Sequence, residues 1–161
     1  MKKISILFAF AVLVFSCDPQ KKIAGNYSYE TECLGVEMDG SQTLKAWGTG
    51  NTNEDAIEQA KKNAVRDVLF KGIRNGKPDC EVRAVLTEVN AQENHATYFN
   101  NFFADGGPYK NYVNIKDGTD TQKMMMDGDK KGSNVQYGVI VRVLRTALIK
   151  RMTDDNILNL K

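Results

Sequence analysis

The clearest hydrophobic pattern in the chain predicts a helix between residues 53 and 71. Apolar side chains recur there every third or fourth residue, at Ala56, Ile57, Ala60, Ala64, Val65, Val68 and Leu69. Thr52 or Asn53 can cap its start, and Lys71 followed by Gly72 is typical of a helix end. Because the alanines stand four residues apart, the apolar face is small. We therefore expect this helix to lie close to a sheet.

Runs of strand-forming residues precede and follow this helix. Residues 27–37 and 43–48 are two such runs, and the Asp39-Gly40 pair between them indicates a hairpin. Similar patterns predict later strands at 81–89, 109–115 and 135–144, and later helices at 93–103 and 146–160. This order predicts an α+β fold, with a mainly antiparallel sheet of about four to five strands and about two to three helices packed on one face.

The first residues predict a lipoprotein signal peptide. Lys2 and Lys3 precede an apolar run over residues 4–15, which is too short to cross a membrane as a helix. The run ends at Ser16-Cys17, a sequence that looks like a lipobox, although Phe15 is larger than the residue usual at its position. We expect cleavage before Cys17 and attachment of lipid to this cysteine. The alternative is an ordinary signal peptide cut a few residues later, which leaves Cys17 as a free thiol.

Cleavage divides the chain into a signal peptide at 1–16, a lipidated cysteine with a tether at 17–26, and one α+β domain at 27–161. Within that domain, the polar residues around 116–134 predict a mobile loop. Loss of the two signal lysines leaves 20 basic and 20 acidic residues, so nothing favours nucleic acid as a partner. Asp18 stands alone before Lys21-Lys22. We therefore expect an outer-membrane anchor on the periplasmic side rather than the cell surface.

The two remaining cysteines suggest a disulfide. Export places Cys33 and Cys80 in an oxidising compartment, where a single pair is expected to be bridged. The alternative is two buried thiols that act as small apolar side chains.

No motif predicts a catalytic residue, a metal or a cofactor. Gly48-Thr49-Gly50 lacks the rest of a nucleotide-binding signature and reads as a tight strand-to-helix turn. The stretch 127–132 begins like a calcium loop, but Lys131 and Gly138 stand where oxygen ligands are needed. His95 is the single histidine and has no nucleophile motif beside it. We therefore do not expect an enzyme.

Aromatic residues gather between 98 and 112. Most of them are expected to form core between a helix and the sheet. Phe103 lies about 100° around the helix from Phe102 and is expected at the margin of the core. Tyr112 is expected on the strand face opposite Val113. If Phe103 and Tyr112 are exposed together, they are candidates for binding a partner.

The segment 44–50, followed by the alanine-faced helix, resembles a strand and helix signature in small bacterial envelope lipoproteins. That family includes the amino-terminal domain of the flagellar ring protein FlgT and related twenty-kilodalton lipoproteins. Residues 139–152 are similar to the end of the same domain. The resemblance implies a non-enzymatic structural or adaptor role that binds another envelope protein. The alternative function is a small-ligand or glycan-binding module that uses the aromatic segment 98–112.

Overall fold

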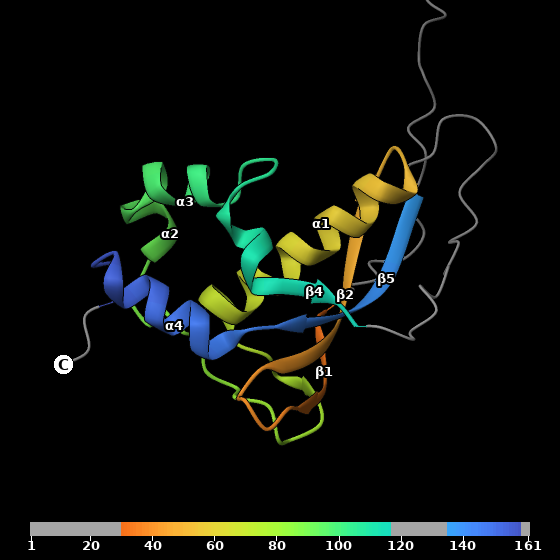
Figure 1. Ribbon diagram of the computed structural model, residues 1–161, viewed down its shortest axis with the longest axis horizontal. Helices are drawn as coiled ribbons and strands as arrows, with labels where there is room; N and C mark the ends of the chain where they lie inside the picture. Colours follow the sequence, from red (N-terminus) through yellow and green to blue (C-terminus); the bar gives the residue numbers. More distant parts are fainter. Residues whose placement is uncertain (1–29, 117–134, 159–161) are drawn as a thin grey trace, which may run out of the picture.

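The computed structural model describes residues 30–116 and 135–158, which form an α+β fold around a mostly antiparallel sheet (Figure 1). The strands lie in the order β3-β1-β2-β5-β4, and only the β1–β3 pair is parallel. The strands are β1 (Glu32–Val36), β2 (Gln42–Gly50), β3 (Asn75–Gly76), β4 (Val113–Ile115) and β5 (Val135–Val143). The predicted fold class is therefore confirmed.

Helix α1 (Asn53–Arg66) lies along β2 and β5, as the small size of its apolar face predicts (Figure 1). Thr52 caps its start, since the Asp55 amide donates to Thr52 Oγ1 at 3.1 Å and the Thr52 amide donates to the Asp55 carboxylate. Gly48 lies against the helix so closely that a Cβ there would come 2.1 Å from the carbonyl oxygen of Ala56. The Gly-x-Gly segment is thus a close-packed turn between strand and helix.

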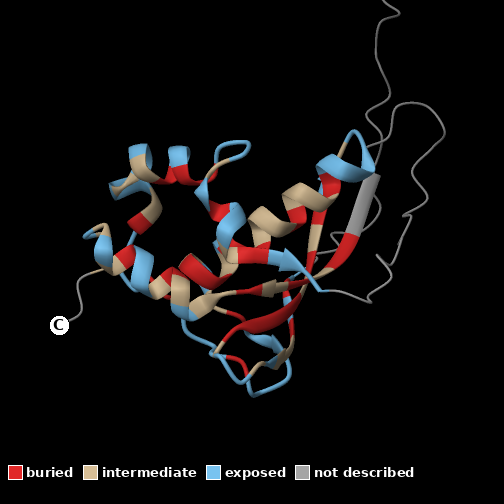
Figure 2. Ribbon diagram, in the orientation of Figure 1, coloured by how far each residue is buried: buried red, intermediate tan, exposed pale blue. Residues whose placement is uncertain are grey.

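The core lies between this helix and one face of the sheet, and both elements carry buried residues (Figure 2). Along β2, Gln42, Leu44 and Ala46 alternate onto that face, opposite Val143, Val141 and Val139 of β5. Lys45 and Trp47 point to the other face, where the ring of Trp47 lies over Gly138.

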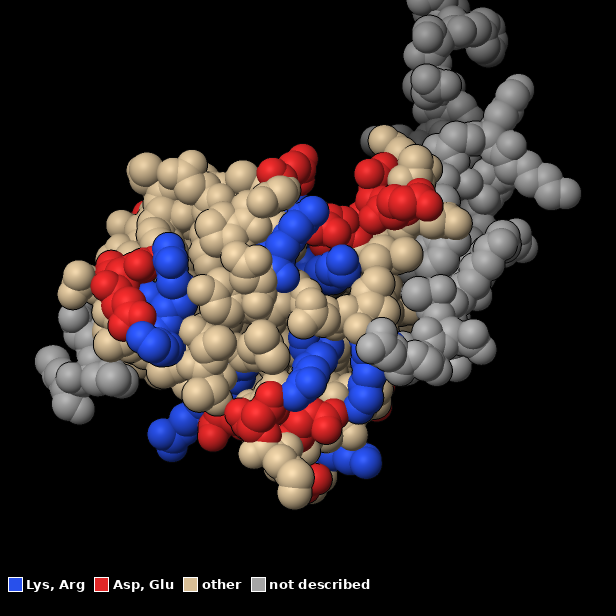
Figure 3. Space-filling view, in the orientation of Figure 1, with Lys and Arg blue, Asp and Glu red and all other residues tan. Residues whose placement is uncertain are grey.

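The β1–β2 hairpin forms at the predicted Asp-Gly turn and is braced by Arg142 of β5. Arg142 donates to Ser41 Oγ at 2.6 Å and pairs with the Asp39 carboxylate at 2.6 Å. Lys116 pairs with Glu37 at 2.7 Å on the same side of the sheet. In the face shown in Figure 3, acidic and basic side chains accordingly lie next to one another.

Helix α1 continues into a π-helical turn, η1 (Asp67–Lys71), and ends at Gly72, whose φ is 75°. The turn explains why the predicted strand at 81–89 is wrong. The amides of Val85 and Leu86 donate to the carbonyl groups of Val68 and Leu69, at 3.0 and 2.8 Å. The segment therefore completes the hydrogen bonds of a helix end instead of joining the sheet.

Three further elements differ from their predicted limits. The helix expected at 93–103 is divided at His95 into α2 (Ala91–Asn94) and α3 (Ala96–Phe102). The strand expected at 109–115 is mostly a 3-10 helix, η2 (Pro108–Tyr112), and only its last residues enter the sheet as β4. The last helix, α4, is shorter than expected and spans Arg145–Asp154. Figure 1 shows α2, α3 and α4 gathered at the end of the molecule away from the start of α1.

The predicted signal peptide at 1–16, the tether at 17–26 with Cys17, and most of the loop predicted around 116–134 lie outside the described residues. Among the helices of the described segments, none has the length and apolar character needed to cross a membrane.

Candidate functional site

Phe103, which was expected at the margin of the core, is buried, with 6 % of its surface exposed. The expectation assumed that the sheet alone covers the aromatic helix. Instead, Phe70 of the π-helical turn lies 6.5 Å from the Phe103 ring, Tyr109 lies 6.0 Å from it, and Arg66 covers it at 4.9 Å. Phe103 is thus enclosed from a side that the sheet does not reach. The expected place at the margin of the core is wrong, and the exposure that would have made Phe103 a candidate for partner binding is not met.

Tyr112 is half-buried rather than exposed, because it belongs to the 3-10 helix and stacks on Phe102 at 5.9 Å. It therefore does not form an exposed pair with Phe103. Phe99, Phe102 and Tyr109 are buried as well. This burial removes the observation on which a ligand site in segment 98–112 was based.

Two buried or half-buried phenols tie this aromatic cluster to its surroundings. Tyr98 donates to the Asp155 carboxylate at 2.6 Å, and burial together with that carboxylate raises the pKa of Tyr98 to about 12. Tyr109 donates to Glu58, and burial followed by this hydrogen bond raises the pKa of Tyr109. Both phenols stay protonated at neutral pH and keep donating these hydrogen bonds. Tyr98 thereby links α3 to the end of α4, and Tyr109 links η2 to α1.

Cys33 and Cys80 are joined by a disulfide, with their Cα atoms 6.1 Å apart. The prediction of a bridge is confirmed. Cys33 lies on β1. Cys80 lies in the loop that follows β3 and leads to Val85 and Leu86, the residues that donate hydrogen bonds to η1. The disulfide therefore fastens this loop to the hairpin strand.

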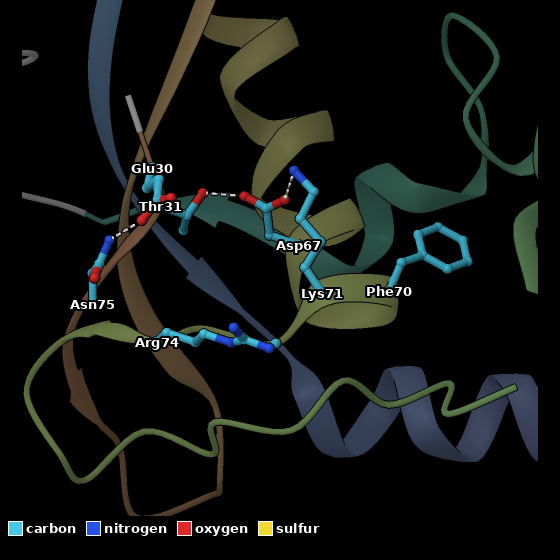
Figure 4. Close-up of a pocket in the computed structure, with 8 residues that line it drawn as sticks. Glu30, Thr31, Asp67, Phe70, Lys71, Arg74 and Asn75 are labelled. Carbon is cyan, nitrogen blue, oxygen red and sulfur yellow. Dashed lines mark hydrogen bonds and ion pairs between the residues drawn. The ribbon is translucent and has the colours of Figure 1, made fainter. Parts of the chain in front are cut away.

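A first cleft, of about 510 Å³, lies at the π-helical turn between η1 and the start of β1 (Figure 4). Its polar groups are largely paired with one another. Thr31 Oγ1 donates to the Asp67 carboxylate at 2.5 Å, Lys71 pairs with the same carboxylate at 3.1 Å, and Asn75 donates to Glu30. A ligand here would have to displace hydrogen bonds and ion pairs that the chain already makes.

A second cleft, of about 580 Å³, lies at the hairpin end of the sheet, and we call it the hairpin-end cleft. It is an open cleft lined by the β1–β2 hairpin, the disulfide-bonded loop and the first residue of α4. Its lining residues include Val36, Gly40, Gln42, Asp79, Glu81, Val82, Arg83 and Arg145.

The hairpin-end cleft contains buried polar groups without partners. Gln42 is 1 % exposed, and within the described part of the chain neither its Nε2 nor its Oε1 has a hydrogen-bond partner. The Nη1 nitrogen of Arg145 is buried and unpartnered in the same way. Such groups usually carry a free-energy cost and call for an explanation. They make this cleft the candidate functional site.

The charge of Arg145 is also poorly compensated. Burial lowers the pKa of its guanidinium, and the nearby carboxylate of Glu81 acts in the opposite direction to a smaller extent. Arg145 is the first residue of α4, and no side chain caps that helix end. The partial positive charge of a helix N-terminus adds to that of the guanidinium, so an anion would be stabilised here.

The sequence places these two residues for simple reasons. Gln42 begins β2 and alternates onto the same face as Leu44 and Ala46, so its amide is carried into the core side of the sheet. A polar residue in this otherwise apolar series was the signal that sequence reasoning missed. Arg145 carried no such signal, because an arginine at a helix start usually faces solvent.

Two residues that line the hairpin-end cleft are apolar and exposed. Val36 and Val82 line it with 42 % and 50 % of their surfaces exposed, and Met38 at the hairpin turn is fully exposed. The Cys33–Cys80 disulfide joins the loop that carries Val82 to β1, which carries Val36. The ion pair between Arg142 and Asp39 restrains the hairpin turn. The cleft therefore presents apolar side chains beside the exposed charged residues Asp79, Glu81 and Arg83, and the disulfide and the Arg142 contacts restrain its walls.

The remaining candidate chemistry lies elsewhere. His95 is half-buried at the break between α2 and α3 and lies 3.3 Å from Glu88. Within the described residues, no three side chains of His, Cys, Asp or Glu come together as a metal ion would require. No known protein family, curated protein or solved structure matches this chain.

Proposed function

We propose that this protein is a lipid-anchored accessory protein of the cell envelope, facing the periplasm, and that it binds another envelope protein without catalysing a reaction. The anchor is supported by Cys17 directly after the apolar run of residues 4–15. The binding role is supported by one observation, the unpartnered buried amide and guanidinium of the hairpin-end cleft.

The chemistry of these groups favours recognition over reaction. A glutamine amide donates and accepts hydrogen bonds, and a guanidinium donates them, but neither group gives up or takes a proton at neutral pH. Groups of this kind fix the position of a partner. A partner that satisfied them would recover the hydrogen bonds that the free chain lacks at Gln42 and Arg145.

The surroundings of the cleft favour a protein as the partner. Val36 and Val82 present exposed apolar surface in the cleft, beside the exposed charged side chains of Asp79, Glu81 and Arg83. Apolar contacts bordered by polar side chains are typical of protein interfaces. The Cys33–Cys80 disulfide restrains one wall before binding, so less conformational freedom is lost in the complex.

Photo-crosslinking in intact cells tests this proposal. A photoreactive phenylalanine analogue replaces Met38, which is exposed in the hairpin turn between the lining residues Val36 and Gly40. In a matched strain it replaces exposed Glu54 at the start of α1. We expect an adduct with an envelope protein from position 38 only, and its loss when Cys17→Ser removes the anchor. Equal labelling from both positions, or none from position 38, would contradict the binding role.

A further inference from the structure

We propose that the hairpin-end cleft binds the carboxyl-terminal end of a peptide chain, with the terminal carboxylate on Arg145 and the last peptide groups on Gln42. This inference rests on the proposed binding function and names the chemistry of the partner segment. Its basis is the presence of the Arg145 guanidinium, the Gln42 amide and the exposed apolar side chains of Val36 and Val82 in the same cleft.

Gln42 is suited to a peptide backbone because both ends of its amide are unpartnered. Both atoms are covered in the free chain, so the side chains above them must move before a peptide can contact the amide. Its Nε2 can donate to a peptide carbonyl group, and its Oε1 can accept a peptide N–H. A simple anion would satisfy only the donor and would leave the buried oxygen without a partner. In an extended peptide the N–H and the C=O of one residue belong to neighbouring peptide groups and point to the same side, so a side-chain amide can pair with both.

Arg145 is suited to a carboxylate. Its Nη1 nitrogen is buried, and no group in the described part of the chain accepts a hydrogen bond from it. Hydrogen bonds between a guanidinium and a carboxylate are charge-assisted and short, and they can form in pairs. At a chain end, the carboxylate and the last peptide N–H are separated by a single residue, so one terminus can reach both groups of the same cleft.

The exposed residues of the cleft add two preferences. Asp79 and Glu81 are exposed and acidic, so a basic side chain a few residues before the terminus would be attracted to them. Val36 and Val82 offer apolar contact to a small aliphatic side chain. We therefore expect a terminus with an aliphatic last residue and a nearby lysine or arginine.

Titration of the full mature chain in detergent micelles, followed by NMR, tests the inference with defined probes. The first probe is N-acetyl-Lys-Ala-Ala with a free carboxylate, and the second is the same peptide with a terminal carboxamide. We expect the free acid to shift the side-chain amide signals of Gln42 and the Nε–H signal of Arg145. The carboxamide should bind at least about tenfold more weakly, because it loses the charge-assisted hydrogen bonds.

Two variants and a matched control locate the effect. Arg145→Met keeps the aliphatic stem and removes the charge, so both probes should bind it with equal weakness. Gln42→Leu should weaken both probes. Arg142→Met removes an arginine that already pairs with Asp39 and Ser41 outside the cleft, and it should preserve the preference for the free acid.

Equal affinity for the two probes, or absence of shifts at Gln42 and Arg145 with the free acid, would overturn the inference. Each outcome can be separated from the proposed function. An adduct from position 38 without any preference for the carboxylate would retain a binding protein and reject this ligand class. Binding of the free acid without an adduct would retain the peptide site and reject the envelope partner.

Discussion

Replacing Gln42 with leucine should make the protein more stable, which is the reverse of the usual effect of altering a buried residue. In the structure, Gln42 is 1 % exposed and both polar atoms of its amide lack partners within the described part of the chain. Leucine has a similar volume and needs no hydrogen bond. The free energy now lost by burying the amide would be recovered.

The magnitude follows from the cost of a buried polar group without a partner, about 1–3 kcal/mol. Leucine branches at Cγ where glutamine does not, and fitting that shape costs up to about 1.5 kcal/mol. We therefore expect a gain of about 1.5 kcal/mol in the free energy of unfolding. For a domain of this size, this gain corresponds to a rise in Tm of about 3–6 °C.

Urea unfolding and scanning calorimetry of the two proteins measure this gain directly. Gln59→Leu is the matched control. Gln59 is a half-buried residue of α1, and its amide already donates to Asn63 Oδ1 at 2.9 Å. The control removes a hydrogen bond that exists, so it should not increase stability. The same Gln42 variant should bind the peptide more weakly, which would couple a gain in stability to a reduction of function.

A Gln42→Leu protein that is less stable than the parent chain would refute this reasoning. Such a result would mean that the amide makes favourable interactions in the free protein. The assignment of the hairpin-end cleft as a site prepared for a ligand would then lose its main support.

Four other outcomes are expected. Replacing both Cys33 and Cys80 with alanine should cost about 4 kcal/mol in urea unfolding, because the bridge closes a loop of 47 residues. Phe103→Ala should cost about 3 kcal/mol in the same assay by opening a cavity, and a negligible change would contradict its burial. Cys17→Ser should abolish incorporation of radiolabelled fatty acid, and persistent labelling would exclude this cysteine as the anchor. Hydrogen bonds from Ser41, and then the charge of Arg142, lower the pKa of Asp39. The ionised Asp39 carboxylate should therefore stabilise the fold above its usual pKa of 3.8, and this stabilisation should disappear as the pH falls through the lower folded-state pKa. Asp39→Asn should flatten this acid dependence in urea unfolding.

The parts of the fold that sequence predicts well depend on local chemistry. The Asp39-Gly40 turn, the cap at Thr52 and the alanine face of α1 each specify their structure within a few residues. The disulfide was also predictable, because Cys33 and Cys80 are the one pair of cysteines left if Cys17 carries a lipid, as the sequence predicts.

The errors arise where distant segments provide hydrogen bonds or cover. The alternating residues of 81–89 resemble a strand, yet the amides of Val85 and Leu86 pair with carbonyl groups of the π-helical turn. The exposure of Phe103 was misjudged because Phe70 and Arg66 of the preceding helical segment cover it. Neither contact leaves a pattern near the residue concerned.

The candidate site is where the local preferences of the sequence conflict with burial. Leu44 and Ala46 follow the apolar requirement of the inner sheet face, and Gln42 breaks it two residues earlier. Conflicts of this kind are expected at functional positions, where stability is given up for another property. The conflict at Gln42 lies beside a second one at Arg145, in a cleft whose loop is fastened by a disulfide. Because both conflicts would be relieved by the same peptide terminus, recognition of a partner explains their presence better than two independent defects of packing.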